Sequence, residues 1–321
     1  MGSGLYSSVQ YRAVFAQHAM AFFPGASKLI ASGAVVIDPN PPFRGQGGLT
    51  YSVPAFHSIA STTAKSVVPT AATDGTRNAL ATWKDVGTIT EREYGVANEQ
   101  SLLLALGSDQ DPNGEIERQT GEFWGQECSL SLISVLKGAF ADAMSGAQFV
   151  AGPAVPMGNV TPSDLIGLAC VGDQWSTFTI WIVPSKQYGQ LLDAGLIKTF
   201  EAPMFSERLV QNGVIETFLG KQIVVDDNIA TDGSTYLLKP GAMYLGYQSD
   251  PRVEYQYDAS LGGGTHEFWF RSAYMPHLYG LNYAGAVKPT NTTLETGASW
   301  TLSQSTTYKL HKAVKILFAN T

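Results

Sequence analysis

The residues best suited to chemistry in this sequence are the adjacent acids Asp226 and Asp227, which follow the apolar run of residues 223–225. Adjacent carboxylates can bind a cation or share a proton. Neighbouring residues on a strand point to opposite faces, so both acids can reach one ligand only if the strand ends there. Asp and Asn also favour turns, because their side chains bond to nearby backbone groups. We therefore expect Asp226, Asp227 and Asn228 to form a turn, with a cation site as the alternative.

Other patterns that mark ligand sites are incomplete. Gly220 and Lys221 are followed by Gln222, without the upstream glycine and the Ser or Thr of a phosphate-binding P-loop. The glycine run of residues 262–264 does not sit between a convincing strand and helix, so we expect a flexible loop, with nucleotide binding as the alternative.

The histidines and the possible nucleophiles form no recognisable catalytic pattern. No Gly-x-Ser-x-Gly elbow is present, and spacing alone assembles no Ser/His/Asp triad. The five histidines lack metal-ligand spacing, and no other histidine lies close to the pair His266 and Glu267. They are His18, His57, His266, His277 and His311. We expect no catalytic residue, no cofactor site and no metal site.

Composition restricts the class of protein. With 321 residues the chain exceeds the usual size of a single core, so two or more packed subregions are expected. A formal charge of −7 and a pI of about 5.2 argue against a basic face that grips nucleic-acid phosphates. Four tryptophans lie among apolar neighbours, which predicts core packing rather than base stacking. They are Trp175, Trp181, Trp269 and Trp300.

Cysteine content and the amino terminus predict a soluble protein that is not exported by a signal peptide. Cys128 and Cys170 are too few for a disulfide scaffold, and their apolar surroundings fit a reducing compartment. No charged segment followed by an apolar stretch opens the chain, and no run approaches the roughly 20 apolar residues that span a bilayer. We expect no membrane contact.

Hydrophobic spacing divides the chain into segments. Residues 7–21 carry apolar side chains at helical spacing and predict a helix that ends before Pro24. Residues 32–100 are rich in Gly, Pro, Ser and Thr, with short alternating stretches such as residues 49–53 that predict strands between long turns. This segment has little core of its own.

A long helix is predicted over residues 112–144. Asp111 and Pro112 form a strong helix start, because proline at the first helical position loses no hydrogen bond. Downstream, apolar residues fall on one stripe: Trp124, Cys128, Leu132, Val135 and Ala139. A helix of this length usually serves as a backbone for other parts.

The rest of the chain alternates helix and strand signals. Residues 180–183 and 223–225 predict buried strands, Thr161-Pro162 and Pro184-Ser185 predict helix starts, and Gly195 predicts a helix end. From Tyr308 onward the alternation predicts a half-buried strand, which we expect to pair beside the long helix.

Several local sequences, taken with the order of these segments, are similar to one known family. They are residues 182–191, with Pro184 where a histidine is more usual; residues 217–227, with a glycine turn, a strand and paired acids; residues 236–242; Pro276 and His277 with Gly280; and residues 288–291 with Leu294, Trp300 and Lys309. Lys288 replaces a commoner asparagine. Together they resemble the major capsid proteins of tailed bacteriophages with the Hong Kong 97-type fold.

The resemblance implies an α+β fold of four parts. These are an N-terminal arm of residues 1–31, an extended β-hairpin E-loop of residues 32–100, a peripheral P-domain of residues 101–145 and 285–321 with a spine helix at about 112–144, and an axial A-domain of residues 146–284. It implies self-assembly as pentamers and hexamers into an icosahedral virion shell around phage double-stranded DNA, made in the bacterial host cytoplasm.

The resemblance also implies partners. These are copies of the chain, a separate scaffolding protein, a portal protein, decoration proteins and weak, non-specific contact with DNA. Some family members cross-link an E-loop lysine to an asparagine of a neighbour; here Lys65 and Lys84 are available donors and Asn291 a conceivable acceptor, although lysines in a polar loop are usually only solvated. Alternatives are an encapsulin-like shell around protein cargo, a β-rich tail or adhesin protein, and an α/β enzyme.

Overall fold

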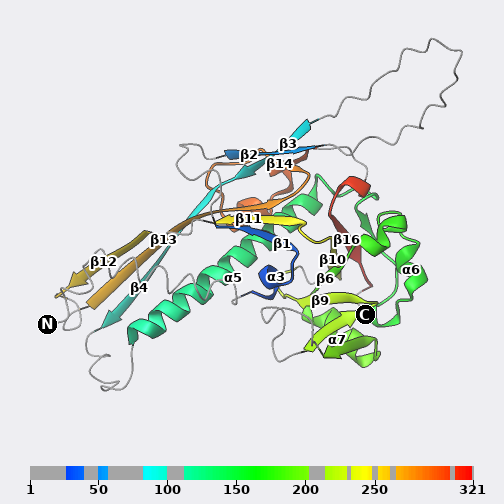
Figure 1. Cartoon of the computed structure of the whole chain (residues 1–321), viewed down its shortest axis with the longest axis horizontal. Helices are drawn as coiled ribbons and strands as arrows, with labels where there is room; N and C mark the ends of the chain where they lie inside the picture. Colours follow the sequence, from blue (N-terminus) through cyan, green and yellow to red (C-terminus); the bar gives the residue numbers. More distant parts are fainter. Residues whose placement is uncertain are drawn as a thin grey trace, which may run out of the picture.

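The computed structural model of the chain describes residues 27–39, 50–56, 82–99, 112–201, 214–229, 233–247, 252–260, 265–303 and 308–319. The helix predicted in residues 7–21 lies outside these ranges. The described part combines helices with three β-sheets, which confirms the predicted α+β class. Three paired strands, residues 90–99, 252–258 and 265–278, form a ladder. This ladder and one end of a long helix project from a broader body (Figure 1).

The longest element is α5 (Pro112–Ala141), a helix of 30 residues and therefore roughly 45 Å in length. It begins at the predicted proline and ends three residues before the predicted position 144. The predicted apolar stripe is buried: Trp124, Cys128, Leu132, Val135 and Ala139. All of residues 131–136 are buried, so this part of the helix is covered on every side, as a core helix must be.

A five-stranded sheet built from distant segments covers one side of α5. Its strands are β1 (Val35–Asp38), β4 (Thr90–Glu99), β11 (Met243–Tyr247), β12 (Arg252–Asp258) and β13 (Thr265–Leu278). The 14-residue β13 pairs with β12 over residues 265–271, with β4 over residues 265–274 and with β11 over residues 274–278. The projecting ladder therefore shares one continuous strand with the body (Figure 1).

A seven-stranded sheet forms the core of the body. Its order is β5 (Val150–Ala151), β16 (Ala313–Leu317), β10 (Ser234–Leu238), β6 (Ile180–Val183), β9 (Lys221–Val225), β8 (Val214–Phe218) and β7 (Ile197–Glu201). The two predicted strands are confirmed as β6 and β9, which pair in parallel. The predicted helix starts are confirmed in α6 (Pro162–Ile166) and α7 (Ser185–Asp193), and Gly195, with φ of +66°, follows the end of α7. The hairpin β7–β8 was not predicted.

The carboxyl-terminal strand lies in a different place from the predicted one. β16 is a strand as expected, but it pairs with β10 and β5 instead of lying beside the long helix. All five residues of β10 are buried, so this strand requires a neighbour on each side. β6 covers one side and β16 covers the other.

A four-stranded sheet carries the hairpin of the E-loop region. Its order is β15 (Trp300–Leu302), β14 (Leu281–Tyr283), β3 (Thr82–Thr88) and β2 (Thr50–Phe56). β2 confirms the strand predicted near residues 49–53 and pairs antiparallel with β3 over seven residue pairs. The hairpin joins β14 through the single pair Asn282 and Val86.

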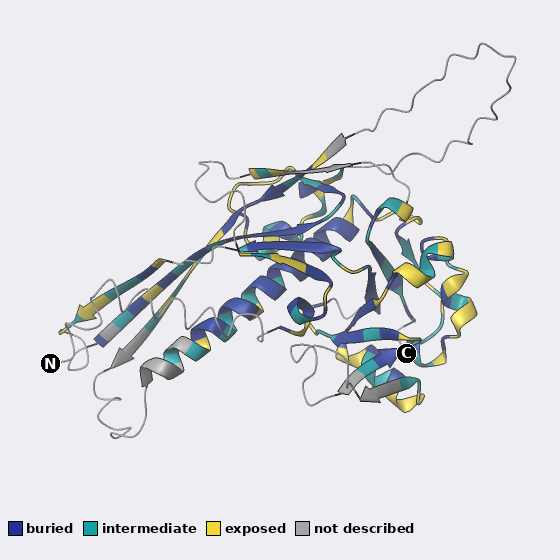
Figure 2. Cartoon of the chain, viewed as in Figure 1, coloured by how far each residue is buried: buried dark blue, intermediate teal, exposed yellow. Residues whose placement is uncertain are grey.

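Three buried clusters account for the fold: two large ones and a smaller one of Ile89, Tyr244 and Met275. Buried residues are dark blue in Figure 2. Along β6, Ile180 and Ile182 belong to the cluster around α5, whereas Trp181 and Val183 belong to the cluster under α6 and α7. Successive strand residues point to opposite faces, so an unbroken apolar run indicates a sheet covered on both faces. No described helix combines the length and the apolar composition needed to cross a membrane.

We predict that Gly138→Ala strongly destabilises the subunit. A Cβ at Gly138 of α5 would lie 2.0 Å from the carbonyl oxygen of Leu294 and 2.7 Å from Nε1 of Trp300. Relieving that overlap should lower the free energy of unfolding by about 3 kcal/mol, measured by urea denaturation of unassembled subunits.

The matched control is Gly189→Ala in α7, where an added Cβ meets no atom within 4 Å. This change should raise stability by about 0.5–1 kcal/mol, because alanine is the better helix former. Equal effects of the two substitutions would show that α5 is not closely wrapped at Gly138.

Candidate functional site

The paired acids form a turn, as predicted, and one of them also caps a helix, which was not predicted. Asp226 Oδ1 accepts hydrogen bonds from the backbone and side-chain nitrogens of Asn228, each at 2.9 Å. Asp227 Oδ1 accepts from the backbone nitrogen of Ser185 at 2.7 Å and so caps the first turn of α7. That bond lowers the pKa of Asp227, whereas burial raises the pKa of Asp226. The two carboxylates thus serve different partners.

Gly220 belongs to a tight hairpin rather than to a phosphate loop. Leu219 and Gly220 both have positive φ, +51° and +76°, and connect β8 to β9 in the two-residue turn that suits twisted strands. The next residue, Lys221, is buried, and its Nζ donates to the carbonyl oxygens of Trp175 and Phe178. Desolvation by burial lowers the pKa of Lys221 to about 8.

The two cysteines are buried. Burial raises the pKa of both Cys128 and Cys170, to about 11 for Cys170, which suppresses thiolate chemistry. No group of three or more potential metal ligands occurs in the part of the chain that the structure describes. His277 and His311 are buried. His18, His57, the side chain of His266 and the glycine run 262–264 lie outside the described part.

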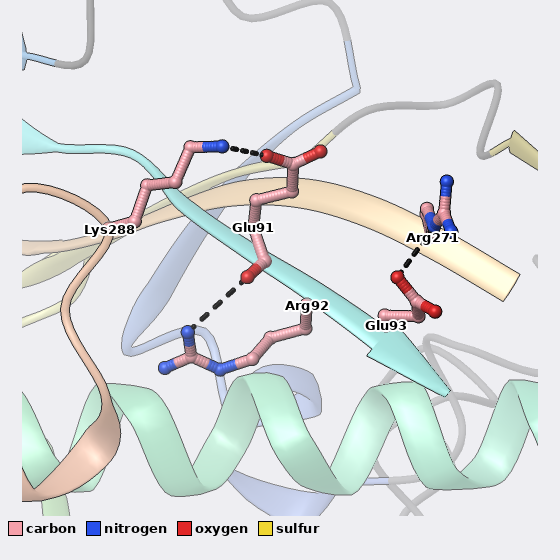
Figure 3. A pocket seen from close by; sticks show the side chains of 5 residues that line it. All are labelled: Glu91, Arg92, Glu93, Arg271 and Lys288. Atoms are coloured by element: carbon pink, nitrogen blue, oxygen red, sulfur yellow. Dashed lines mark hydrogen bonds and ion pairs between the residues drawn. The ribbon is translucent and has the colours of Figure 1, made fainter. Parts of the chain in front are cut away.

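The densest polar network instead joins the ladder to α5. Arg92 on β4 points toward α5, with its Nε 3.5 Å from Oε1 of Glu127 and its Nη2 donating to the carbonyl oxygen of Pro289 at 2.7 Å (Figure 3). Asn291 Nδ2 donates to the same Glu127 oxygen at 2.9 Å. Its Oδ1 accepts from Ser131 at 2.7 Å. β4, α5 and the segment before α8 (Asn291–Leu294) are therefore fastened at one point.

This network places the residues considered for cross-linking. Both polar atoms of the Asn291 side chain are engaged within the chain. Lys84 lies exposed on β3, and Lys65 lies outside the described residues. Sequence reasoning missed Arg92 and Glu127, because they are 35 positions apart and no local pattern links them.

The face of the ladder that points away from α5 carries exposed charged residues of both signs. Glu91 pairs with Lys288, and Arg271 Nε lies 2.6 Å from Oε2 of Glu93 (Figure 3). Trp269, predicted to pack in a core, is 37 % exposed here and contacts the bare backbone of Gly95. Trp181 and Trp300 are buried as predicted.

A buried carboxylate holds the root of the β2–β3 hairpin. Asp85 on β3 is inaccessible to solvent; its Oδ2 accepts from the backbone nitrogen of Gly280 at 2.7 Å, and its Oδ1 accepts from the hydroxyl of Ser303. Nε2 of buried His277 lies 3.4 Å from Oδ2. A buried carboxylate is stable only with such partners, so Asp85 fixes the hairpin to the β13–β14 turn.

Comparisons with known proteins place this geometry in a family of shell proteins. A family model described as Major capsid protein 13-like matches residues 28–310. No protein of curated function matches the sequence.

Solved structures share the fold over nearly the whole chain. The capsid of cyanophage Pam1 has 12% sequence identity and a TM-score of 0.53, covering 92% of each chain. The capsid of Ralstonia phage GP4 has 10% identity and a TM-score of 0.56, covering 90% of this chain and 88% of that one. A structure from Mycobacterium phage Adephagia has 11% identity and a TM-score of 0.52, covering 92% and 91%. At these identities the likeness concerns the fold.

Removing the buried carboxylate should loosen the hairpin root. We predict that Asp85→Ala lowers the free energy of unfolding by roughly 3 kcal/mol, because the nitrogen of Gly280 and the hydroxyl of Ser303 lose their acceptor. Urea denaturation gives the size, and hydrogen exchange of residues 82–88 shows where protection is lost. Glu93→Ala removes an exposed ion pair and should cost under about 1 kcal/mol. Equal losses in the two variants would contradict the assigned role of Asp85.

Lys221 should make stability rise with pH in the alkaline range. Its folded pKa of about 8 lies below the ordinary lysine value of 10.5, so between these pH values the unfolded chain binds more protons than the folded chain. The free energy of unfolding of the wild type, minus that of Lys221→Met, should therefore increase from pH 8 to 10.5. A flat difference across parallel denaturation curves would mean that Lys221 titrates normally.

Proposed function

This chain belongs to the Major capsid protein 13-like family and forms a capsid shell, and we propose that its copies assemble as pentamers and hexamers around a phage double-stranded DNA genome. The observation that carries the proposal is the family match over residues 28–310, together with the fold shared with phage capsids. That fold is the Hong Kong 97-type α+β fold predicted from the sequence. The family match favours this function over a cargo-enclosing encapsulin, a tail or adhesin protein, and an enzyme.

Three parts of the fold suit the roles of a subunit in a capsid shell. We assign the A-domain, which would meet other copies around the five- and six-fold axes, to the seven-stranded sheet with α6 and α7. The P-domain, predicted as residues 101–145 and 285–321, contains α5, and it would seal contacts between capsomers. We add to it the ladder of β4, β12 and β13 from the ranges predicted for the E-loop and the A-domain, and we move β16 to the A-domain because it pairs with β10. The β2–β3 hairpin would be the base of an E-loop that lies over a neighbouring subunit.

Two features favour contact with further copies. The ladder is covered by α5 on one face and exposes charges and Trp269 on the other. Tryptophan and arginine are enriched at the centres of protein interfaces. The hairpin of β2 and β3 extends the four-stranded sheet beyond β14. Stable interfaces bury on the order of 800 Å² per partner, which projecting elements of this kind can provide.

The proposal extends to other partners and to the place of assembly. A separate scaffolding protein, a portal protein and decoration proteins would take part, and assembly would occur in the bacterial cytoplasm. With a net charge of −7 the chain would touch DNA only weakly and without sequence preference. Cross-linking of Lys65 or Lys84 to Asn291 of a neighbour stays a prediction, which denaturing electrophoresis of shells would test.

Electron microscopy of the purified protein tests the proposed function. We expect capsomers and closed icosahedral shells, because the exposed ladder face and the hairpin become buried only between copies. Sedimentation at rising concentration should show the same assembly. Discrete monomers at high concentration would contradict the proposal, and protein cargo in place of DNA inside native particles would favour an encapsulin.

A further inference from the structure

Two lysines stand side by side at one end of the seven-stranded sheet. The backbone nitrogen of Lys239 donates to the carbonyl oxygen of Lys312 at 2.9 Å, which continues the β10–β16 pairing by one residue beyond Leu238 and Ala313. These strands lie next to each other in the body (Figure 1). Like charges placed opposite each other on paired strands repel, so this arrangement destabilises the fold unless something offsets it.

Among the described residues, neither ammonium group forms a direct ion pair with a carboxylate, although the charge of Asp173 acts on Lys239. Lys239 Nζ donates to Oε1 of Gln174 at 3.2 Å and to the carbonyl oxygen of Lys309 at 3.3 Å. Lys312 Nζ donates to the carbonyl oxygen of Gly241 at 3.0 Å. All three acceptors are uncharged, and neither lysine forms an ion pair with a carboxylate of that part of the chain. The nearby Asp173 pairs with Lys309 instead, at 2.6 Å.

Aromatic rings hold both ammonium groups in fixed positions. Nζ of Lys239 lies 5.0 Å from the centre of the Phe178 ring, and Nζ of Lys312 lies 4.6 Å from that of Tyr279. Such contacts orient a cation without cancelling its charge. Burial lowers the pKa of both lysines; the charge of Lys312 lowers the pKa of Lys239 further, and the charge of Asp173 opposes this shift. A nearby anion would relieve both the burial and the repulsion.

The remaining donors indicate what kind of anion fits. An ammonium group has three N–H donors, so Lys239 keeps one and Lys312 keeps two after their bonds to the chain. Both side chains are partly exposed. Lysine acts on phosphate as a point charge and does not form the bidentate pair that arginine forms. Three free N–H donors on two side chains therefore suit loose, exchangeable contacts with successive phosphates.

We propose that Lys239 and Lys312 contact backbone phosphates of the packaged DNA, so that this end of the seven-stranded sheet faces the interior of the shell. This inference rests on the proposed function, which places DNA inside the particle. The negative charge of the chain as a whole repels DNA, so attraction has to come from a local patch. Contacts made only to phosphates give binding without sequence preference.

The test compares the double variant Lys239→Gln/Lys312→Gln with a control, Lys28→Gln/Lys186→Gln, that removes the same charge from two exposed positions. Binding of unassembled subunits to a short random-sequence DNA duplex is followed by fluorescence anisotropy across a salt series. Each phosphate contact contributes about 0.9 to the slope of log affinity against log salt, so the double variant should lose a slope of about 2. A fourfold rise in salt should then weaken wild-type binding about tenfold more than that of the double variant. The control should match the wild type.

Electron microscopy of the same proteins separates this inference from the proposed function. Shells from all three proteins, with the slope lowered only in the double variant, support the phosphate contact. Normal shells with an unchanged slope overturn the inference and leave the proposed function standing. Loss of assembly in the double variant alone also overturns it, because the lysines would then meet carboxylates of a neighbouring copy. A wild type that binds DNA through these lysines but forms no shell overturns the proposed function alone.

Discussion

The structure depends on the burial of α5 from all sides over residues 131–136. Strands β13 and β11 contact the helix from one side, and the segment from α8 to Trp300 closes over another, near enough that Gly138 has no room for a side chain. Polar groups fix the register of this packing, because buried Ser131 binds both Tyr274 and Asn291, and Ser134 binds Glu295. A buried hydroxyl without a partner would be costly, so each of these bonds restricts how the covering segments can slide along the helix.

This packing produces a molecule whose centre, α5 and the seven-stranded sheet, is well covered and whose margins, the ladder and the β2–β3 hairpin, project. The seven-stranded sheet has apolar clusters on both faces, whereas the ladder has α5 on one face only. A subunit of a shell requires this division, since the centre must keep its shape in every copy while the margins meet different neighbours. The family match and the shared capsid fold agree with it.

Local signals in the sequence predicted most of the individual elements and few of the contacts between them. Pro112 and the stripe from Trp124 to Ala139 located α5, and the run at residues 180–183 identified a strand buried on both faces. Alternation in the carboxyl-terminal tail predicted a half-buried strand but carries no information on which sheet it joins, so its placement was wrong. Asp85 and Arg92 depend on partners some 200 positions away, which no local pattern encodes. Because no local pattern in the sequence pointed to a catalytic site, the function could be predicted only from the resemblance to a known family.

The fastening of the β2–β3 hairpin has a mechanical consequence. The hairpin is anchored to the body by buried Asp85, by the pairing of Val86 with Asn282, and by Tyr51, which packs against the buried cluster of Ile89, Tyr244 and Met275, while its own strands pair over seven residue pairs. Its base is therefore broad, and only Ile89 separates β3 from β4 in the chain. A neighbouring copy that pushes on the described part of the hairpin would transmit the force through this base into β4 and the strands paired with it, so contact at the hairpin and the position of the ladder would be mechanically coupled.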